Sequence, residues 1–146
     1  MTTARPSLPH WRELTTVFRT PVRPHDTALL RRARMLAGVH QVRVLHPGRE
    51  AVFEAGRAAL RARIAEWITS HTGARPAAAA ACAAAIDDMA AAHVTAERML
   101  RAEPPVSPEQ LHAAWFDVGF LACQWADLVA EVVDGQPPVP WPLERR

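Results

Sequence analysis

The stretch EQLHAAWFDVGFLACQWADLVAEVVDG, residues 109–135, carries apolar side chains on two sides of one helix-length segment. Its first apolar side repeats at alternating steps of four and three residues, which is the spacing of a heptad seam. This seam consists of Leu111, Trp115, Val118, Ala122, Trp125, Val129 and Val132. The second apolar side adds Phe116, Phe120 and Cys123. Both sides of such a helix must be covered, so the pattern predicts a helix within a bundle, and a homodimer that covers the second side.

Proline clusters divide the rest of the chain into segments of helical length. They lie at residues 5–9, 20–24, 46–48, 103–108 and 136–142. Between them apolar residues recur every three or four positions, which predicts helices at 10–19, 25–46, 49–71, 76–102 and 107–135. The sequence therefore predicts an all-α fold. A four-helix bundle over 25–135 follows an N-terminal arm with a short extra helix over 1–24, and a Pro-rich tail over 136–146 closes the chain.

Length and composition suit one domain with one core. The chain has 146 residues, of which 49% are hydrophobic. All 17 basic residues are arginine, which is typical of a GC-rich bacterial genome. The net charge is +2, and the arginines are scattered among 15 acidic residues. No continuous basic stripe is present in the sequence, so we expect no nucleic-acid partner.

The cysteines and the start of the chain indicate the compartment. Cys82 and Cys123 are isolated and lack CxxC spacing, so neither a disulfide framework nor a zinc knuckle is expected. The first residues, MTTARPSLPHWRELTTVF, contain no continuous apolar run. We also find no stretch of about 18 apolar residues of the kind that spans a membrane. These features favour a cytoplasmic protein without membrane association.

An acidic pair, Asp87-Asp88, interrupts the alanine-rich segment ACAAAIDDMAAAHVTAERML at residues 81–100. The alanines favour a helix and let neighbouring helices approach closely. Adjacent residues on a helix point about 100° apart, so the two carboxylates cannot both line one face. Measured from Ile86, Asp88 projects to the far side and Asp87 to the flank. Because acids stay exposed unless they are paired, both are expected on a solvated face.

Two histidines are expected to point into the bundle. His93 lies on the same face as Cys82, Ile86, Met89 and Leu100, with Glu97 one turn ahead. His40 lies among Leu29, Ala33, Leu36 and Val44. One interpretation is a pair of core histidines, each satisfied by a carbonyl partner. The other is an acid–base site, in which Glu97 orients His93 and His40 lies opposite.

Three tryptophans, Trp67, Trp115 and Trp125, are also expected to point inward, with Phe120 beside them. Large aromatic residues most often fill a core, but they can also wall a flat apolar ligand pocket. Asp127 and Arg57 lie at the edges of their apolar faces. Their two interpretations are an ion pair across the bundle or anchors for a polar ligand.

Known metal and cofactor motifs are nearly absent from the sequence. Glu109 and His112 match the Glu-x-x-His unit of di-metal bundle proteins, but a second such unit is missing. The match also lies in the capping turn, where Glu109 favours the helix dipole. Neither a glycine-rich phosphate loop nor a Gly-x-Ser-x-Gly elbow is present. We therefore expect no metal and no cofactor.

Three segments resemble a known bacterial family. They are RAALRARIAEWI at 57–68, AIDDMA at 85–90 and LHAAWFDVGFLACQWADLVAEVVDGQPPVP at 111–140. Their order and spacing are similar to those of the domain-of-unknown-function family 4254, over residues 30–140. The resemblance implies a helical fold and no assigned chemistry, so it transfers no catalytic residue.

Two functional hypotheses follow from these patterns. In the first, the protein is a dimer that binds a small organic molecule between its helices. As an enzyme it would be a cofactor-free lyase, isomerase or cyclase of specialised metabolism that uses histidine acid–base chemistry. In the second, it is a non-enzymatic interaction or regulatory module that docks a partner through its helical faces.

Overall fold

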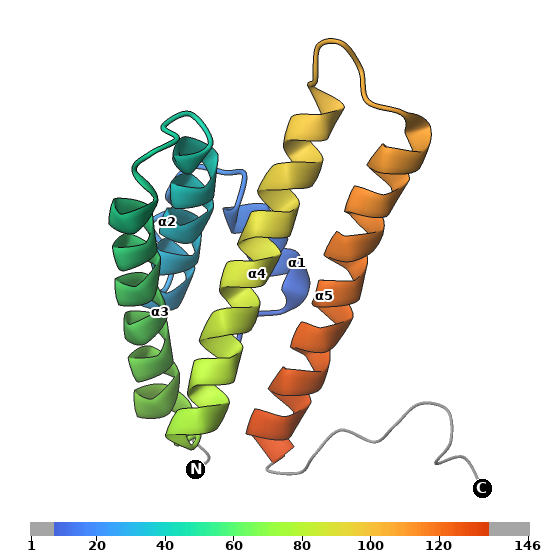
Figure 1. Cartoon of the computed structure of the whole chain (residues 1–146). Helices are drawn as coiled ribbons and strands as arrows, with labels where there is room; N and C mark the ends of the chain where they lie inside the picture. Colours follow the sequence, from blue (N-terminus) through green and yellow to red (C-terminus); the bar gives the residue numbers. More distant parts are fainter. Residues whose placement is uncertain (1–7, 135–146) are drawn as a thin grey trace, which may run out of the picture.

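The structure is a computed structural model that describes residues 8–134, and its regular elements in that range are five α-helices. Figure 1 shows their arrangement. The helices are α1 (Trp11–Val17), α2 (Ala28–Arg43), α3 (Glu50–Thr72), α4 (Pro76–Leu100) and α5 (Pro108–Asp134). The prediction of an all-α fold is therefore confirmed. The expected Pro-rich tail over 136–146 lies outside the described residues.

Local capping signals set the helix ends. Thr27 begins α2, and its hydroxyl accepts a hydrogen bond from the Leu30 amide. At the start of α5 the Ser107 hydroxyl accepts from the Gln110 amide, and the Gln110 side chain accepts from the Ser107 amide. Gly73 ends α3 in the left-handed conformation, with φ of 72°. The capping box at Ser107 and the left-handed Gly73 therefore set the start of α5 and the end of α3.

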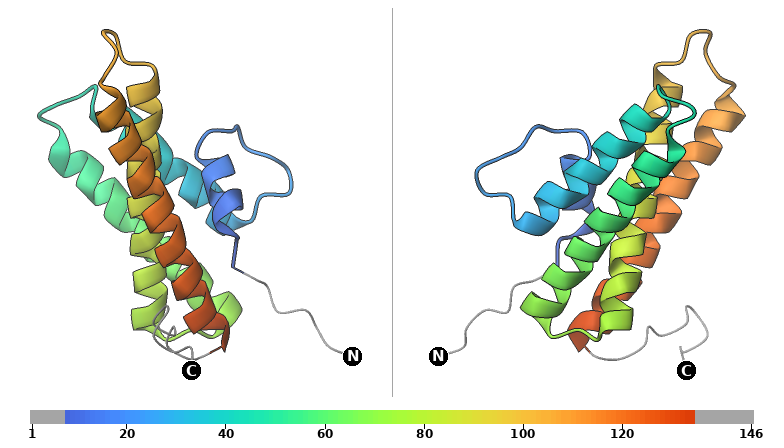
Figure 2. Two further views of the ribbon diagram at one scale, coloured as in Figure 1. Left: turned by 90° about the vertical axis from the view of Figure 1, so that its right-hand side faces the viewer. Right: turned by 60° about the vertical axis from the view of Figure 1, so that its left-hand side comes forward.

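The α4 helix is the centre of the molecule. It packs against α2, α3 and α5, and the short α1 packs against α2, α4 and α5. Figures 1 and 2 show α4 between α3 on one side and α5 on the other. Small side chains permit this close packing because Ala79, Ala83, Ala90 and Ala96 are all buried on α4. By length and composition α4 could cross a membrane, but half of its most apolar window is buried inside the protein, as in the core helix of a soluble protein.

The two apolar sides of α5 have different environments. The predicted heptad seam faces the core, where Ala122 and Trp125 are buried. The Trp125 indole donates to the Pro9 carbonyl at 2.9 Å and so fixes the N-terminal segment to α5. On the second side Phe116 is 64% and Phe120 is 55% exposed. One chain therefore covers α5 on one side, and its second apolar side lies in solvent.

Candidate functional site

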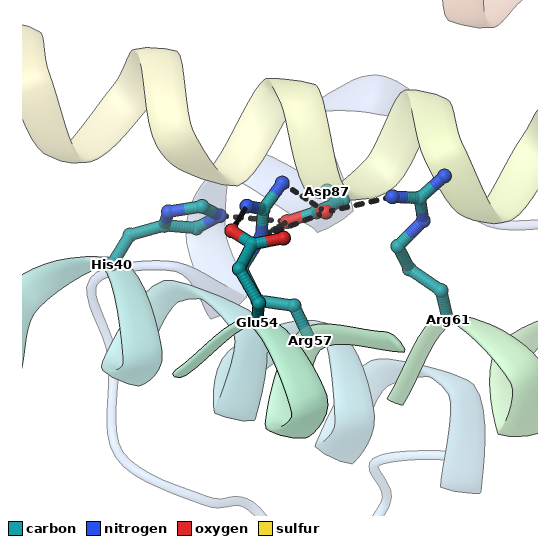
Figure 3. A network of polar contacts seen from close by, with 5 residues as sticks. All are labelled: His40, Glu54, Arg57, Arg61 and Asp87. Carbon is teal, nitrogen blue, oxygen red and sulfur yellow. Dashed lines mark hydrogen bonds and ion pairs between the residues drawn. The ribbon is translucent and has the colours of Figure 1, made fainter. Parts of the chain in front are cut away.

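A buried carboxylate joins three helices. Asp87 on α4 is 1% exposed and faces α2 and α3. Its Oδ1 lies 2.6 Å from Nε2 of His40 on α2, and its Oδ2 accepts from Nη2 of Arg57 on α3 at 2.8 Å. Arg61, one turn further along α3, places its guanidinium 3.7 Å from the same Oδ2. Figure 3 shows these three side chains converging on Asp87, together with Glu54, which pairs with Arg57.

The surroundings of Asp87 keep it ionised. Burial raises the pKa of this carboxyl, but hydrogen bonds from His40 and Arg57, and the charges of both groups, outweigh burial and hold the pKa below its ordinary value. An ionised carboxylate only accepts hydrogen bonds, so Nε2 of His40 carries the proton that it shares with Asp87. Asp87 therefore fixes both the orientation and the protonated nitrogen of the His40 ring.

The prediction of a solvated position is wrong for Asp87, which is buried, and correct for Asp88, which is exposed. The error arises because α4 is packed by helices on several sides, so its buried arc extends past Ile86 to the flank that Asp87 occupies. An isolated amphipathic helix would have left that flank in water. The sequence does contain one indication of the buried ion pair between Asp87 and Arg57. An acidic residue stands next to a buried position, and another helix carries arginines that can face it.

The expected ion pair between Arg57 and Asp127 is also wrong. Asp127 is exposed on α5, whereas Arg57 pairs with Asp87 and Glu54. The cause is again the central place of α4, which separates α3 from α5 (Figure 1). Arg57 remains part of the candidate site, but it acts there as a partner of the buried carboxylate.

The second nitrogen of His40 is the unusual feature of the site. The His40 side chain is 2% exposed, and its Nδ1 is buried without a hydrogen-bond partner among the described residues. Figure 3 shows this nitrogen on the side of the ring away from Asp87, toward the C-terminal half of α4. Buried polar atoms nearly always have partners, so an unpaired imidazole nitrogen marks a place where a ligand group can bind.

A cavity of about 580 Å³ borders His40. It lies between the C-terminal ends of α2 and α4, and its volume is in the range of small-molecule sites. Its apolar lining is Val44, Ala91, Val94, Met99 and Ala102. Its polar lining, besides His40, is Arg43, Thr95, Arg98, Arg101 and Glu103. Sequence reasoning missed these arginines, whose positions at helix ends agree equally well with a purely dipolar role.

His93 points inward as predicted and is 3% exposed. Its ring lies against those of Phe18 and Trp115, with centroid distances of 5.7 and 5.9 Å. Its Nε2 is 3.8 Å from a Glu97 oxygen. Burial lowers the pKa of His93; Glu97 raises it and Arg19 lowers it further.

His93 and His40 border different cavities. The cavity of His93 measures about 340 Å³ and includes Glu97, whereas His40 borders the cavity of about 580 Å³. The two cavities adjoin, because Arg98 and Val94 line both. His40 and His93 therefore border adjoining cavities, and an acid–base site that contains both histidines stays a prediction.

The aromatic residues expected to wall one pocket lie in different surroundings. Trp125 is buried in the core, and Trp67 is half-buried and stacked on His71 with a centroid distance of 4.0 Å. Trp115 meets the His93 ring edge-on, and Phe120 is exposed on the outer side of α5. A shared aromatic pocket is therefore not formed by these four residues.

Residues 8–134 contain no group of three His, Cys, Asp or Glu side chains placed to hold a metal ion. Glu109 and His112 are both exposed on the first turns of α5. Both cysteines are free. Burial is the main cause that raises the pKa of the Cys82 thiol to about 11, with a contribution from Glu131, whereas Cys123 is exposed.

Comparisons of the chain with protein-family models, curated proteins and solved structures found no match.

Proposed function

We propose that this protein binds a small organic molecule in the cavity beside His40, with Nδ1 of His40 as the group that meets the ligand. The observation that carries the proposal is that His40, whose Nδ1 is buried without a hydrogen-bond partner among the described residues, lines a cavity of about 580 Å³. Asp87 supports it, because a carboxylate on the far nitrogen of an imidazole orients the ring for proton transfer in many enzymes. Arg57 in turn holds Asp87 ionised.

The chemistry of this arrangement is general acid–base catalysis. An imidazole nitrogen can take a proton from a bound ligand or return one to it, and the opposite carboxylate stabilises the charged ring. This favours a cofactor-free isomerisation, elimination or cyclisation in a cytoplasmic bacterial protein, and both cysteines being free agrees with a reducing compartment. The resemblance to family 4254 remains part of the proposal and adds no reaction to it.

A fragment screen by ligand-detected NMR tests the proposal. Thr95 is exposed and lines the cavity, so Thr95→Trp should fill the cavity without disturbing the core. Ala80→Trp is the matched control, because Ala80 is exposed near the opposite end of α4. We expect fragments that bind the unmodified protein and the Ala80→Trp protein, and that are lost in the Thr95→Trp protein. Equal binding to all three proteins, or binding to none, would contradict the proposal.

The outer side of α5 favours a second role, self-association. Ala113, Phe116, Phe120, Cys123, Asp127 and Ala130 are all exposed and follow steps of three and four residues, which is again a heptad-like spacing. A second copy of the chain that packs there would cover the second apolar side of α5, as expected from the sequence. This surface also suits the alternative function, a module that docks a partner helix.

Sedimentation equilibrium tests the self-association. Phe120→Glu places a charge in the exposed seam, whereas Ala126→Glu places the same charge on an exposed position outside it. We expect a dimer for the unmodified protein and for Ala126→Glu, and a monomer for Phe120→Glu. If the unmodified protein is a monomer at every concentration, the proposed dimer is wrong, and the outer side of α5 would have to bind a different partner.

A further inference from the structure

Arginines surround the cavity of His40. Arg43 comes from the last turn of α2, and Arg98 and Arg101 come from the end of α4. Glu103 is the one acidic residue in the cavity lining. Three positive charges and one negative charge give the lining a net charge of +2 when His40 is neutral.

Two of these arginines are available to a ligand. Arg101 lies 3.5 Å from Glu97 in an ion pair, but the side chains of Arg43 and Arg98 make no ion pair or hydrogen bond within residues 8–134. The C-terminal ends of α2 and α4 each contribute about half a negative charge, so together they offset about one of the two net positive charges. The rim therefore stays cationic after the helix dipoles are counted.

The adjoining cavity of His93 extends the positive region. It shares Arg98 and Arg101 with the cavity of His40 and adds Arg19, which follows α1. Its acid, Glu97, already pairs with Arg101. The linings of the two adjoining cavities thus include arginines from three parts of the chain, and Arg98 and Arg101 line both cavities.

The lining of the His40 cavity also includes apolar side chains. Val94 is buried, and Ala91 and Met99 are partly buried beside it. A ligand that fills the cavity therefore contacts these apolar side chains as well as the arginines and His40. The cavity combines a cationic rim, an apolar wall and one buried imidazole.

We infer that the ligand of this cavity is a small organic anion with an apolar body. Arg43 and Arg98 bind its carboxylate or phosphate, because a guanidinium matches either group with two parallel N–H donors. Val94 and Met99 contact its apolar part, and His40 Nδ1 meets the group that reacts. This inference rests on the proposed function, because it specifies the ligand class of the same cavity.

Two fluorescent probes that share one ring system test the inference. The anionic probe is 8-anilinonaphthalene-1-sulfonate, and the neutral probe is N-phenyl-1-naphthylamine. A hydrogen bond to a charged group contributes about 1.5–3 kcal/mol, so the full chain should bind the sulfonate roughly ten- to a hundredfold more tightly. Added salt should weaken the binding of the anionic probe and leave the binding of the neutral probe unchanged, since salt screens the arginine charges.

Arginine variants locate the charge preference. Arg43→Gln and Arg98→Gln should each reduce the preference for the sulfonate severalfold, whereas Arg63→Gln, an exposed residue on α3, should leave it unchanged. Arg43 and Arg98 are exposed, so both variants should keep the helical circular-dichroism signal of the unmodified protein. A preference that persists in both variants would overturn the inference.

The cavity-filling variant separates the two levels of the proposal. In one outcome, Thr95→Trp abolishes the binding of both probes, but the unmodified protein binds the neutral probe as tightly as the sulfonate. The cavity is then a binding site, and the inference of an anionic ligand is wrong. If Thr95→Trp leaves both probes bound, or if neither probe binds the unmodified protein, the proposed function fails as well. Loss of both probes in Thr95→Trp, together with the arginine-dependent preference, supports both.

Discussion

At the scale of single residues, Asp87 is the group on which α2, α3 and α4 meet. Its neighbour Asp88 has the same chemistry and is exposed, so the two form a matched pair. Asp87→Asn removes the charge that balances the buried side of Arg57, and breaking a buried ion pair costs about 3–5 kcal/mol of unfolding free energy. Asp88→Asn should change the unfolding free energy by less than about 0.5 kcal/mol.

Urea unfolding of both variants measures this difference. Equal and small losses of unfolding free energy in the two variants would show that Asp87 is solvated.

The carboxyl group of Asp87 also makes the stability of the protein depend on pH in the acidic range. Because its folded pKa lies below the unfolded value of about 3.9, its stabilisation is complete above that value and is lost as the pH falls through the folded pKa.

His93 should cause a second pH dependence of the unfolding free energy, in a higher pH range than that of Asp87. Burial lowers its folded pKa below the unfolded value of about 6.5, so the unfolded chain binds a proton that the folded chain does not. Stability from this residue is therefore full above about 6.5 and falls as the pH drops toward the folded pKa, by up to about 1.4 kcal/mol per pH unit.

Unfolding free energies at pH 7.5, 6.5 and 5.5 test this dependence. His93→Gln should flatten the profile, whereas His112→Gln, on an exposed turn of α5, should keep it. An unchanged slope in His93→Gln would mean that other groups cause it.

At the scale of elements, α4 depends on small side chains where other helices cross it. Ala90 is fully buried and Ala80 is exposed on the same helix. Ala90→Leu should overpack the contact and destabilise the protein by about 1–3 kcal/mol. Ala80→Leu should be nearly neutral, because leucine and alanine are both good helix formers and no neighbour is displaced. Thermal unfolding compares the two, and equal melting temperatures would place α4 at the surface.

The helices themselves could be predicted from local signals. Thr27, Ser107, Pro108 and Gly73 specify helix ends through contacts within a few residues, and each acts where the sequence places it. The core side of α5 was also predictable, because a heptad-like spacing does not depend on which helix lies opposite.

The candidate site was less predictable, because it depends on which helices flank α4. The burial of Asp87 requires α2 and α3 to meet on its side, and no periodicity within α4 contains that information. His40 was recognised as an inward residue, but its partner was not, since the two are 47 positions apart in the chain. The arginines around the cavity come from different helices and look ordinary one at a time.

At the scale of the whole molecule, the cavity lies where α2 and α4 end, as two long helices stop near each other. The outer side of α5 lies across α4 from α3 (Figure 2). Self-association through α5 would therefore leave this cavity open, so ligand binding and dimer formation should be independent. The sulfonate affinity of Phe120→Glu should equal that of the unmodified protein, and fluorescence titration checks it. A large loss of affinity would place part of the site at the dimer interface.

Imidazole ¹⁵N spectra test the central claim, that Asp87 holds the His40 ring so that Nδ1 meets a ligand. The His40 signals are assigned by their loss in His40→Gln. We expect a proton fixed on Nε2, and an Nδ1 resonance that moves when the sulfonate probe fills the cavity. A neutral ring with its proton on Nδ1, or an Nδ1 resonance that saturating probe leaves unmoved, would contradict it.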